Sequence, residues 1–132
     1  MLKLSKKWDY AIKAMVYIAK LEWNLATVQD IAQKEWISQS LLRRIIADLE
    51  KTHLVSTKKG RWGWVFLWKK VFQISLYDIL SAVWEELSIT SCTRGETCNK
   101  HSSCSTTSVF HSLQIWFNTL LKIYTLEKII KK

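Results

Sequence analysis

Three cysteines lie in one polar stretch of the sequence, and their type and spacing suggest chemistry more clearly than any other residues do. Cys92, Cys98 and Cys104 are separated by five residues in each case. Zinc ribbons and fingers use closer pairs of cysteines, so this spacing is a poor match to a structural zinc site. Iron–sulfur clusters accept thiolates from loops of more varied spacing. The spacing therefore favours a cluster, and the competing interpretation is three free thiols in a surface loop.

The residues around the cysteines support ligand chemistry. Cysteine is normally a buried residue type, so three in one polar loop are unusual for plain surface thiols. Ser and Thr hydroxyls nearby can hydrogen-bond to cluster sulfurs. Basic groups that favour the thiolate form lie between the cysteines, at Arg94, Lys100 and His101. We therefore expect these thiols to bind a cofactor or to react.

The start of the sequence indicates the compartment in which those thiols work. Lys3, Lys6 and Lys7 interrupt the N-terminus before the apolar run of a secretory signal could form. No stretch approaches the roughly 18 apolar residues that a membrane span requires. With an odd number of cysteines as well, a disulfide framework is not expected. We expect a cytoplasmic protein that does not enter a membrane.

Helical segments flank the cysteine stretch and must position it. Residues 88–107 lack apolar periodicity and predict a loop. Before it, Ser75 and Asp78 form a capping box at the start of a helix. Thr125 is placed to cap a last short helix through Ile130. Between the loop and Thr125 runs a long apolar stripe, which could pack on the core or on a second subunit: Val109, Phe110, Leu113, Phe117, Leu120, Leu121 and Tyr124.

Residues 27–67 predict a helix-turn-helix motif followed by a wing. Thr27 and Asp30 form a capping box, and apolar residues then recur at helical spacing. A break at Trp36-Ile37 precedes Ser38, a good cap for a second helix. That second helix has an apolar stripe on one side and a polar, basic face on the other. Such a helix is typical of proteins that read the DNA major groove.

The wing and an N-terminal helix complete the predicted fold. Residues 54–57 and 65–67 read as two strands around a basic turn, and a helix is expected from roughly Asp9 to Leu21. The fold class is mainly α with a small β-wing. The residues expected to contact bases are Gln39, Ser40 and Arg43, and those expected to hold phosphates are Arg44, Lys58, Lys59 and Arg61. An ordinary helical pair with a solvated charged rim is the alternative.

Charge is distributed unevenly along the chain. Residues 1–70 contain 14 Lys and Arg against 6 Asp and Glu, a net charge of +8, whereas residues 71–132 contain 6 against 5. A basic surface on this motif indicates a polyanionic partner. We expect residues 1–70 to form the DNA-binding region and residues 71–132 to hold the cysteine loop and dimerisation helices, within one compact domain.

Taken together, these features resemble the Rrf2 family of bacterial transcription factors. The resemblance covers nearly the whole chain and rests on Leu4-Ser5, Asp9-Tyr10-Ala11, Ile31-Ala32, Ile37-Ser38, Leu42, Leu49-Glu50-Lys51, Leu54-Val55, Gly60-Arg61-Trp62-Gly63-Trp64, Ile79-Leu80-Ser81-Ala82-Val83, the cysteines and Thr125-Leu126. It implies a winged-helix homodimer with a long dimerisation helix. For members with three such cysteines it also implies an iron–sulfur cluster, [2Fe–2S] or [4Fe–4S], in each subunit.

The resemblance also suggests a fourth cluster ligand. IscR-like members of the family carry a histidine three residues after the last cysteine, but Thr107 occupies that position here. NsrR-like members use an aspartate in the first helix of the partner subunit, and Asp9 matches it. Asp9 is therefore the expected ligand, with His101 and His111 as substitutes. Alternatively, Asp9 is simply a favourable charge at a helix N-terminus.

Tryptophan and glycine are present in unusual proportions. The chain has eight Trp and three Gly, whereas the usual share of ~7% would give about nine glycines. Trp36 lies in the motif turn and Trp62 and Trp64 in the wing turn, where glycine is the favoured residue. The others near element ends are Trp8, Trp23, Trp68 and Trp84. One hypothesis is that UGA codons for glycine were translated as tryptophan, and the other is eight real tryptophans that stack on nucleic acid.

The sequence therefore predicts a dimeric regulator, either repressor or activator, that binds a pseudo-palindromic operator in double-stranded DNA. Its DNA affinity would respond to iron–sulfur status, redox state or nitric oxide through the cysteine site. A cluster-free regulator that responds to thiol oxidation or to a protein partner is the first alternative. A small redox or metal-dependent enzyme is the second, but the sequence shows no catalytic triad, paired carboxylates or phosphate loop.

Overall fold

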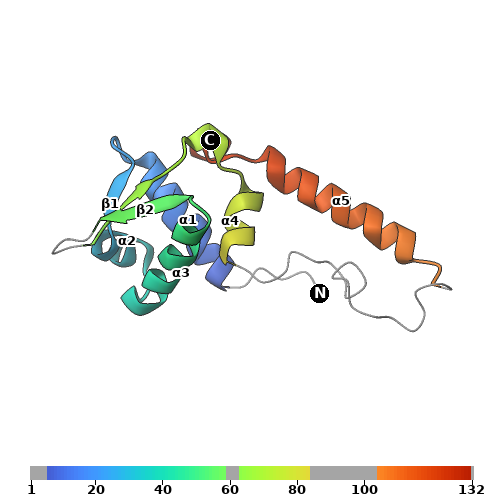
Figure 1. Ribbon diagram of the computed structural model, residues 1–132, viewed down its shortest axis with the longest axis horizontal. Helices are drawn as coiled ribbons and strands as arrows, with labels where there is room; N and C mark the ends of the chain where they lie inside the picture. The colour runs from blue at the N-terminus through green and yellow to red at the C-terminus, as the bar shows by residue number, and fades with distance from the viewer. Residues whose placement is uncertain (1–5, 59–62, 84–103, 132) are drawn as a thin grey trace.

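The computed structural model describes residues 6–58, 63–83 and 104–131, which form a body with one extended arm (Figure 1). The body contains α1 (Lys6–Lys20), α2 (Val28–Glu35), α3 (Gln39–Lys51) and α4 (Leu76–Val83) beside a small sheet. The arm is α5 (Thr107–Ile123), which contacts α4 and otherwise extends away from the body. The short α6 (Leu126–Ile130) returns to pack on α1. The predicted class, mainly α with a small β-wing, is confirmed.

The helix-turn-helix forms where its capping residues predict it. The Thr27 hydroxyl oxygen accepts the Asp30 N–H at 3.0 Å at the start of α2. The Ser38 hydroxyl oxygen accepts the Leu41 N–H at 3.3 Å at the start of α3. Each bond satisfies a backbone donor that has no partner within its own helix, which fixes where the helix begins. The break at Trp36-Ile37 separates the two helices, as predicted.

The sheet has one strand more than the sequence indicates. β2 (Val55–Lys58) and β3 (Trp64–Leu67) pair as the antiparallel hairpin of the wing. β1 (Leu25–Thr27) pairs with the other edge of β3, which gives the order β1-β3-β2. β1 was not predicted, because three residues are too short to show an alternating pattern. Its last residue is also the cap of α2, so the sheet sets where the helix-turn-helix begins.

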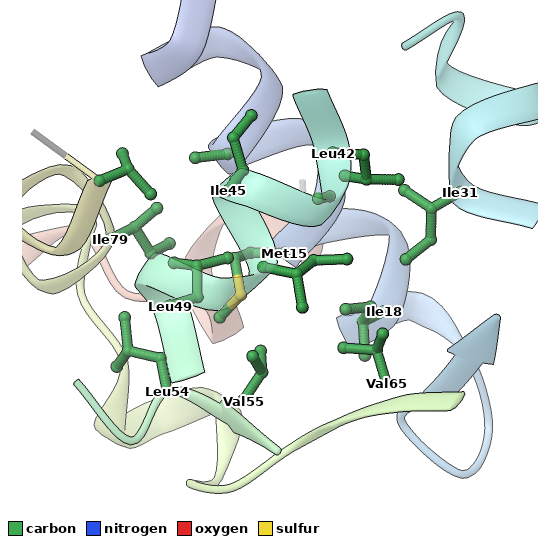
Figure 2. Close-up of a cluster of buried hydrophobic side chains, with 14 of the residues drawn as sticks. Met15, Ile18, Ile31, Leu42, Ile45, Leu49, Leu54, Val55, Val65 and Ile79 are labelled. Carbon is green, nitrogen blue, oxygen red and sulfur yellow. The ribbon is translucent and has the colours of Figure 1, made fainter. Parts of the chain in front are cut away.

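The core lies between α1, α3 and the sheet (Figure 2). Met15 and Ile18 of α1 face the stripe of α3, and Val55 and Val65 close the core from the strands. Apolar residues that recur at helical spacing place one face of α3 in this core and leave its opposite face outside. The fully buried members of the α3 stripe are Leu42, Ile45 and Leu49.

Backbone hydrogen bonds join residues 74–76, before α4, to residues 124–126, after α5, and we call this pairing the clasp. Ser75 and Thr125 form an antiparallel bridge. Beside it, the Leu76 N–H donates to the Tyr124 carbonyl oxygen and the Leu126 N–H donates to the Ile74 carbonyl oxygen, both at 2.8 Å. The clasp fixes the start of α4 next to the start of α6, and with it the C-terminal end of α5.

The other predicted caps form as well. The backbone N–H groups of Ser75 and Asp78 each bond the other residue's side chain, at 3.1 and 3.2 Å, so the capping box of α4 is complete. The Thr125 hydroxyl oxygen accepts the Lys128 N–H at 3.4 Å at the start of α6. A one-turn 3-10 helix, η1 (Val71–Gln73), was not predicted.

Several element boundaries differ from the prediction, those of β2 and β3 by one residue. The first helix begins at Lys6 rather than near Asp9 and ends at Lys20, because its apolar stripe does not define its ends. Helix α5 already includes Thr107, the last residue of the predicted loop. Most of that loop, including Cys92 and Cys98, lies outside the described residues. Among the described helices, none is both long and apolar enough to cross a membrane.

Candidate DNA-binding face and cysteine site

The outer face of α3 carries the residues predicted to read bases. Because its buried stripe points into the core, the opposite side of the helix is left in solvent. All four predicted residues on this helix are exposed there, namely Gln39, Ser40, Arg43 and Arg44. They occupy the N-terminal half of α3, which is the part that reaches base edges in helix-turn-helix proteins.

A shallow hollow of about 360 Å³ separates this helix face from the wing. Arg43 enters it from α3, and Lys58 enters it from the end of β2. Glu50, also in the lining, accepts a hydrogen bond from the Thr57 hydroxyl at 2.7 Å. That bond joins the last part of α3 to β2. Helix and wing therefore present two cations on either side of one concave surface.

The Glu50–Thr57 bond was missed by sequence reasoning. Both residues are polar and exposed, and nothing local indicates that they meet. A net gain of about 1 kcal/mol is typical of such a bond. Its geometric role is more informative, because it ties the wing to α3 at one end of the hollow.

A backbone hydrogen bond anchors the wing to the start of α2, just before β3 begins. The Val28 N–H donates to the Gly63 carbonyl oxygen at 3.1 Å, and Gly63 has φ +64°, a conformation that glycine adopts without strain. At the end of β2, the Lys58 ammonium lies 6.0 Å from the centre of the Phe66 ring. Lys58 is exposed, as a phosphate contact requires. Lys59 and Arg61, also predicted to contact phosphates, lie outside the described residues.

An ion pair links α1 to α3, the second helix of the helix-turn-helix. The Lys7 ammonium of α1 lies 3.0 Å from an Asp48 carboxylate oxygen on α3. Both side chains are partly exposed, so the pair contributes well under 1 kcal/mol to stability. It nevertheless places the first turn of α1, which also contains Asp9, against the helix that carries the predicted base contacts.

Cys104 is the one predicted thiol ligand within the described residues. It is exposed, just before α5, and its sulfur lies 3.2 Å from the Thr106 hydroxyl. Hydrogen bonds from the Thr106 side chain, and then from Thr107, lower the pKa of the thiol to about 7. Hydrogen bonding to the charged form is the cause, and burial opposes it. A large fraction of this thiol is therefore thiolate near neutral pH, the form that binds metal or reacts.

We expect this shift to be visible in alkylation of the metal-free protein. The labelling rate of Cys104 by iodoacetamide should rise through a midpoint near pH 7, rather than near the usual 9.0, because only the thiolate reacts. Replacing Thr106 with Ala should move that midpoint upward. Mass spectrometry of the peptide that contains Cys104 measures the rate separately from the other cysteines. Ser108→Ala is the control, and an equal shift in it would contradict the assignment to Thr106.

Asp9, the predicted fourth ligand, lies in the first turn of α1. Its carboxylate is half-exposed and 2.9 Å from the Lys13 ammonium, so it is accessible but already paired. The N-terminal end of α5, which follows Cys104, projects away from the body that contains α1 (Figure 1). One chain therefore does not bring Asp9 to Cys104. Of the substitutes, His111 is exposed on α5, and His101 lies outside the described residues.

The described ranges alone do not assemble a metal site. Within them, no three His, Cys, Asp or Glu side chains are close enough to hold a metal ion. Two of the three predicted thiols are outside those ranges, and the helix that carries the predicted carboxylate lies away from the N-terminal end of α5 (Figure 1). Cys104 by itself is suited to bind iron, because its thiol is accessible and its pKa is lowered.

Comparison with known proteins identifies the family. A family model described as an iron-dependent transcriptional regulator, Rrf2, matches residues 4–132. An HTH-type transcriptional regulator of Haemophilus influenzae is 30% identical over 99% of this chain and 88% of its own length. The HTH-type transcriptional regulator NsrR of Oceanobacillus iheyensis is 29% identical over 98% of this chain and 90% of its own length.

Solved structures share the fold. The structure of T. potens IscR has a TM-score of 0.77 and 24% identity, covering 98% of this chain and 87% of that one. The structure of CymR, the global cysteine regulator of B. subtilis, has a TM-score of 0.80 and 22% identity, covering 99% and 98%. The chain, with its helix-turn-helix, wing and extended α5, belongs to the Rrf2 family of transcriptional regulators.

Proposed function

We propose that this regulator binds its operator through the outer face of α3 and the wing. The observation that carries the proposal is the hollow between them, where Arg43 and Lys58 face one concave surface. Its opening between a helix and a hairpin suits a DNA strand, with α3 in the major groove. We assign base contacts to Gln39, Ser40 and Arg43, and phosphate contacts to Arg44, Lys58, Lys59 and Arg61.

The charge distribution supports this assignment. The net charge of +8 lies in residues 1–70, the half that contains α3 and the wing. Phosphate contacts release counterions and supply affinity for any sequence, whereas base contacts supply discrimination. We therefore assign DNA binding to residues 1–70, and dimerisation and sensing to residues 71–132.

We further propose that α5 pairs two copies of the chain. Several of its apolar residues stay in solvent in the single chain, with Leu113, Leu120 and Ile123 each about half exposed. These three line a hollow of about 650 Å³ along the helix. Monomeric proteins rarely expose an apolar stripe of this length. A two-fold dimer would place two reader helices about one DNA turn apart, ~34 Å, and would require a pseudo-palindromic operator.

The cysteines are proposed to hold an iron–sulfur cluster, [2Fe–2S] or [4Fe–4S]. Cys92, Cys98 and Cys104 would supply the thiolates, and Asp9 of the partner subunit would supply the fourth ligand. The extension of α5 away from its own α1 supports ligation between subunits. A bound cluster would supply iron whose ligation responds to redox state or to nitric oxide. Within the chain, Lys7 and Asp48 give a contact between the helix of Asp9 and α3.

A second candidate function has an observation of its own. The exposed Cys104 thiol, with its pKa near 7, suits direct oxidation or a mixed disulfide without any metal. A cluster-free regulator that senses oxidants through this thiol would need no ligand from α1. Aerobic and anaerobic purification followed by iron and sulfide analysis distinguishes the two.

The DNA-binding assignment is tested with two substitutions. Arg43→Ala should cost ~1–3 kcal/mol of binding free energy at one base position and relax specificity there. Lys58→Ala should weaken binding to all sequences alike and reduce the slope of log affinity against log salt by about one. Affinities for operator and random DNA, titrated over salt, measure both effects.

Lys128→Ala supplies the matched control, because this exposed lysine lies on α6, outside the proposed face. It should leave both affinities almost unchanged. Equal losses on operator and random DNA for Arg43→Ala and Lys58→Ala together would contradict the division of roles. Losses for Lys128→Ala as large as for Lys58→Ala would move the interface elsewhere.

A further inference from the structure

The turn between α2 and α3 contains a residue whose type does not suit its backbone. Trp36 has φ 57° and ψ 44°, the left-handed conformation. Its N–H and that of Ile37 both donate to the Ala32 carbonyl oxygen, the latter at 3.0 Å. The bond from Trp36 is that of the αL helix ending and the bond from Ile37 is one of the two Schellman bonds, and in both endings the left-handed residue is usually glycine. A Cβ at that position crowds the following carbonyl oxygen.

Two other described residues share this conformation without being glycine. They are Asn24, with φ 49°, and His53, with φ 61°. Asn and His are enriched in the left-handed region, whereas a bulky aromatic residue there is an outlier. Trp36 gains nothing from packing in return, because it is 90% exposed. Neither backbone nor burial therefore explains a tryptophan at this turn.

The tryptophans around the sheet also lie at the ends of elements, although none of the three has a positive φ. Trp23 precedes β1, Trp64 begins β3 and Trp68 follows β3, and all three are exposed. Trp is usually among the most buried residue types by average burial. Glycine is favoured where a chain reverses next to a strand. The shortage of glycine in the chain, three where about nine are usual, matches the excess of tryptophan.

We infer that the natural protein has glycine at positions 23, 36, 62, 64 and 68, and that these tryptophans arise because UGA codons, which the source organism reads as glycine, were translated with a code that reads UGA as tryptophan. Position 62 lies outside the described residues and is included from the sequence alone, which predicts it in the turn of the wing. Trp8 is buried in α1 and Trp116 lies in the middle of α5, so neither belongs to the set. The inference rests on the left-handed backbone at position 36 and on the exposure of positions 23, 36, 64 and 68, and it does not depend on the proposed function.

Glycine at these positions would remove two bulky side chains from the proposed DNA-binding face. Position 36 is two residues before Ser38, the cap of α3, and its side chain is exposed just ahead of the helix that carries the residues assigned to base contact. Glycine there would remove that bulk and let DNA approach the helix N-terminus closely. The wing would likewise carry glycine at 64, next to Lys58, its partner across the strand pair.

The codons of the gene provide the direct test. UGA at positions 23, 36, 62, 64 and 68 is the expected result, and UGG at these positions would overturn the inference. Intact mass of the protein purified from its natural source gives a second reading. A mass that corresponds to glycine at these positions supports the inference, and one that corresponds to tryptophan contradicts it.

Stability supplies a test that needs no natural source. Trp36→Gly should raise the ratio of folded to unfolded protein roughly five- to thirtyfold, because the left-handed strain is relieved. The matched control is Trp116→Gly, which should lower that ratio, because glycine in a helix interior is unfavourable. Urea unfolding of the purified protein measures both. A loss of stability in Trp36→Gly would overturn the inference at that position, and neither measurement involves DNA.

Discussion

Replacing Leu113 and Leu120 of α5 together with glutamate is expected to produce a folded monomer that has lost most of its affinity for a complete operator. Both side chains are about half exposed in the single chain, so the body should fold without them. In a dimer, the substitutions would bury like charges against each other, which is strongly unfavourable. Loss of the second half-site should weaken operator binding by on the order of a hundred- to ten-thousandfold.

Analytical ultracentrifugation at micromolar concentration and titrations with complete and half operators measure these effects. The control changes Ser108 and His111 to glutamate, which adds the same charge to α5. Residue 111 is two positions from Leu113 and therefore lies on the other side of the helix. The control protein should remain dimeric. A dimer that persists in the Leu113 and Leu120 variant would exclude this stripe as the subunit interface.

Replacing Cys104 with alanine is expected to abolish the cluster, whereas replacing Asp9 should only weaken it. Removing one of three thiolates leaves too few strong ligands for iron. A carboxylate oxygen is a harder and poorer ligand for cluster iron than a thiolate. The Asp9→Ala protein should therefore retain part of its iron, and in its apo form it should still dimerise and bind DNA. Anaerobic reconstitution with iron and sulfide analysis and an absorption spectrum measures the difference.

Asp30→Ala is the matched control for Asp9, because Asp30 is also an exposed aspartate in the first turn of a helix. It should have the full iron content. An Asp9→Ala protein with an unchanged spectrum and an unchanged response to nitric oxide would exclude Asp9 and favour His101 or His111. Full iron and sulfide in Cys104→Ala would contradict the cluster site and favour direct thiol sensing.

Local physics made much of the fold predictable from sequence. Thr27 and Ser38 are strong caps, and a cap settles a helix start within a few residues of the chain. The same holds for Ser75 with Asp78. The apolar stripe of α3 follows from helical spacing alone and determines which of its residues remain exposed. For this reason the exposure of Arg43 on the reader helix could be predicted.

Contacts between distant or irregular segments could not be predicted in this way. The Glu50–Thr57 bond depends on how α3 packs against the wing, and the Lys7–Asp48 pair depends on how α3 packs against α1. The pattern of apolar and polar residues within each element does not reveal either packing arrangement. Strand β1 is recognisable only through its pairing with β3. The stripe of α5 was evident, but only the structure shows that little of the body covers it.

The clasp between Ser75 and Thr125 has a consequence for how such a protein can evolve. Helix α4 lies in the body and α5 brings the chain back to it at Tyr124, where the two 2.8 Å hydrogen bonds beside the clasp hold it. Once the ends of a segment are held, each doubling of its length costs only about 0.6 kcal/mol of closure entropy. The helix-turn-helix and wing would therefore stay folded if the cysteine segment were lengthened, shortened or exchanged. New signals can be acquired in this part of the chain while the operator sequence that the protein recognises is inherited unchanged.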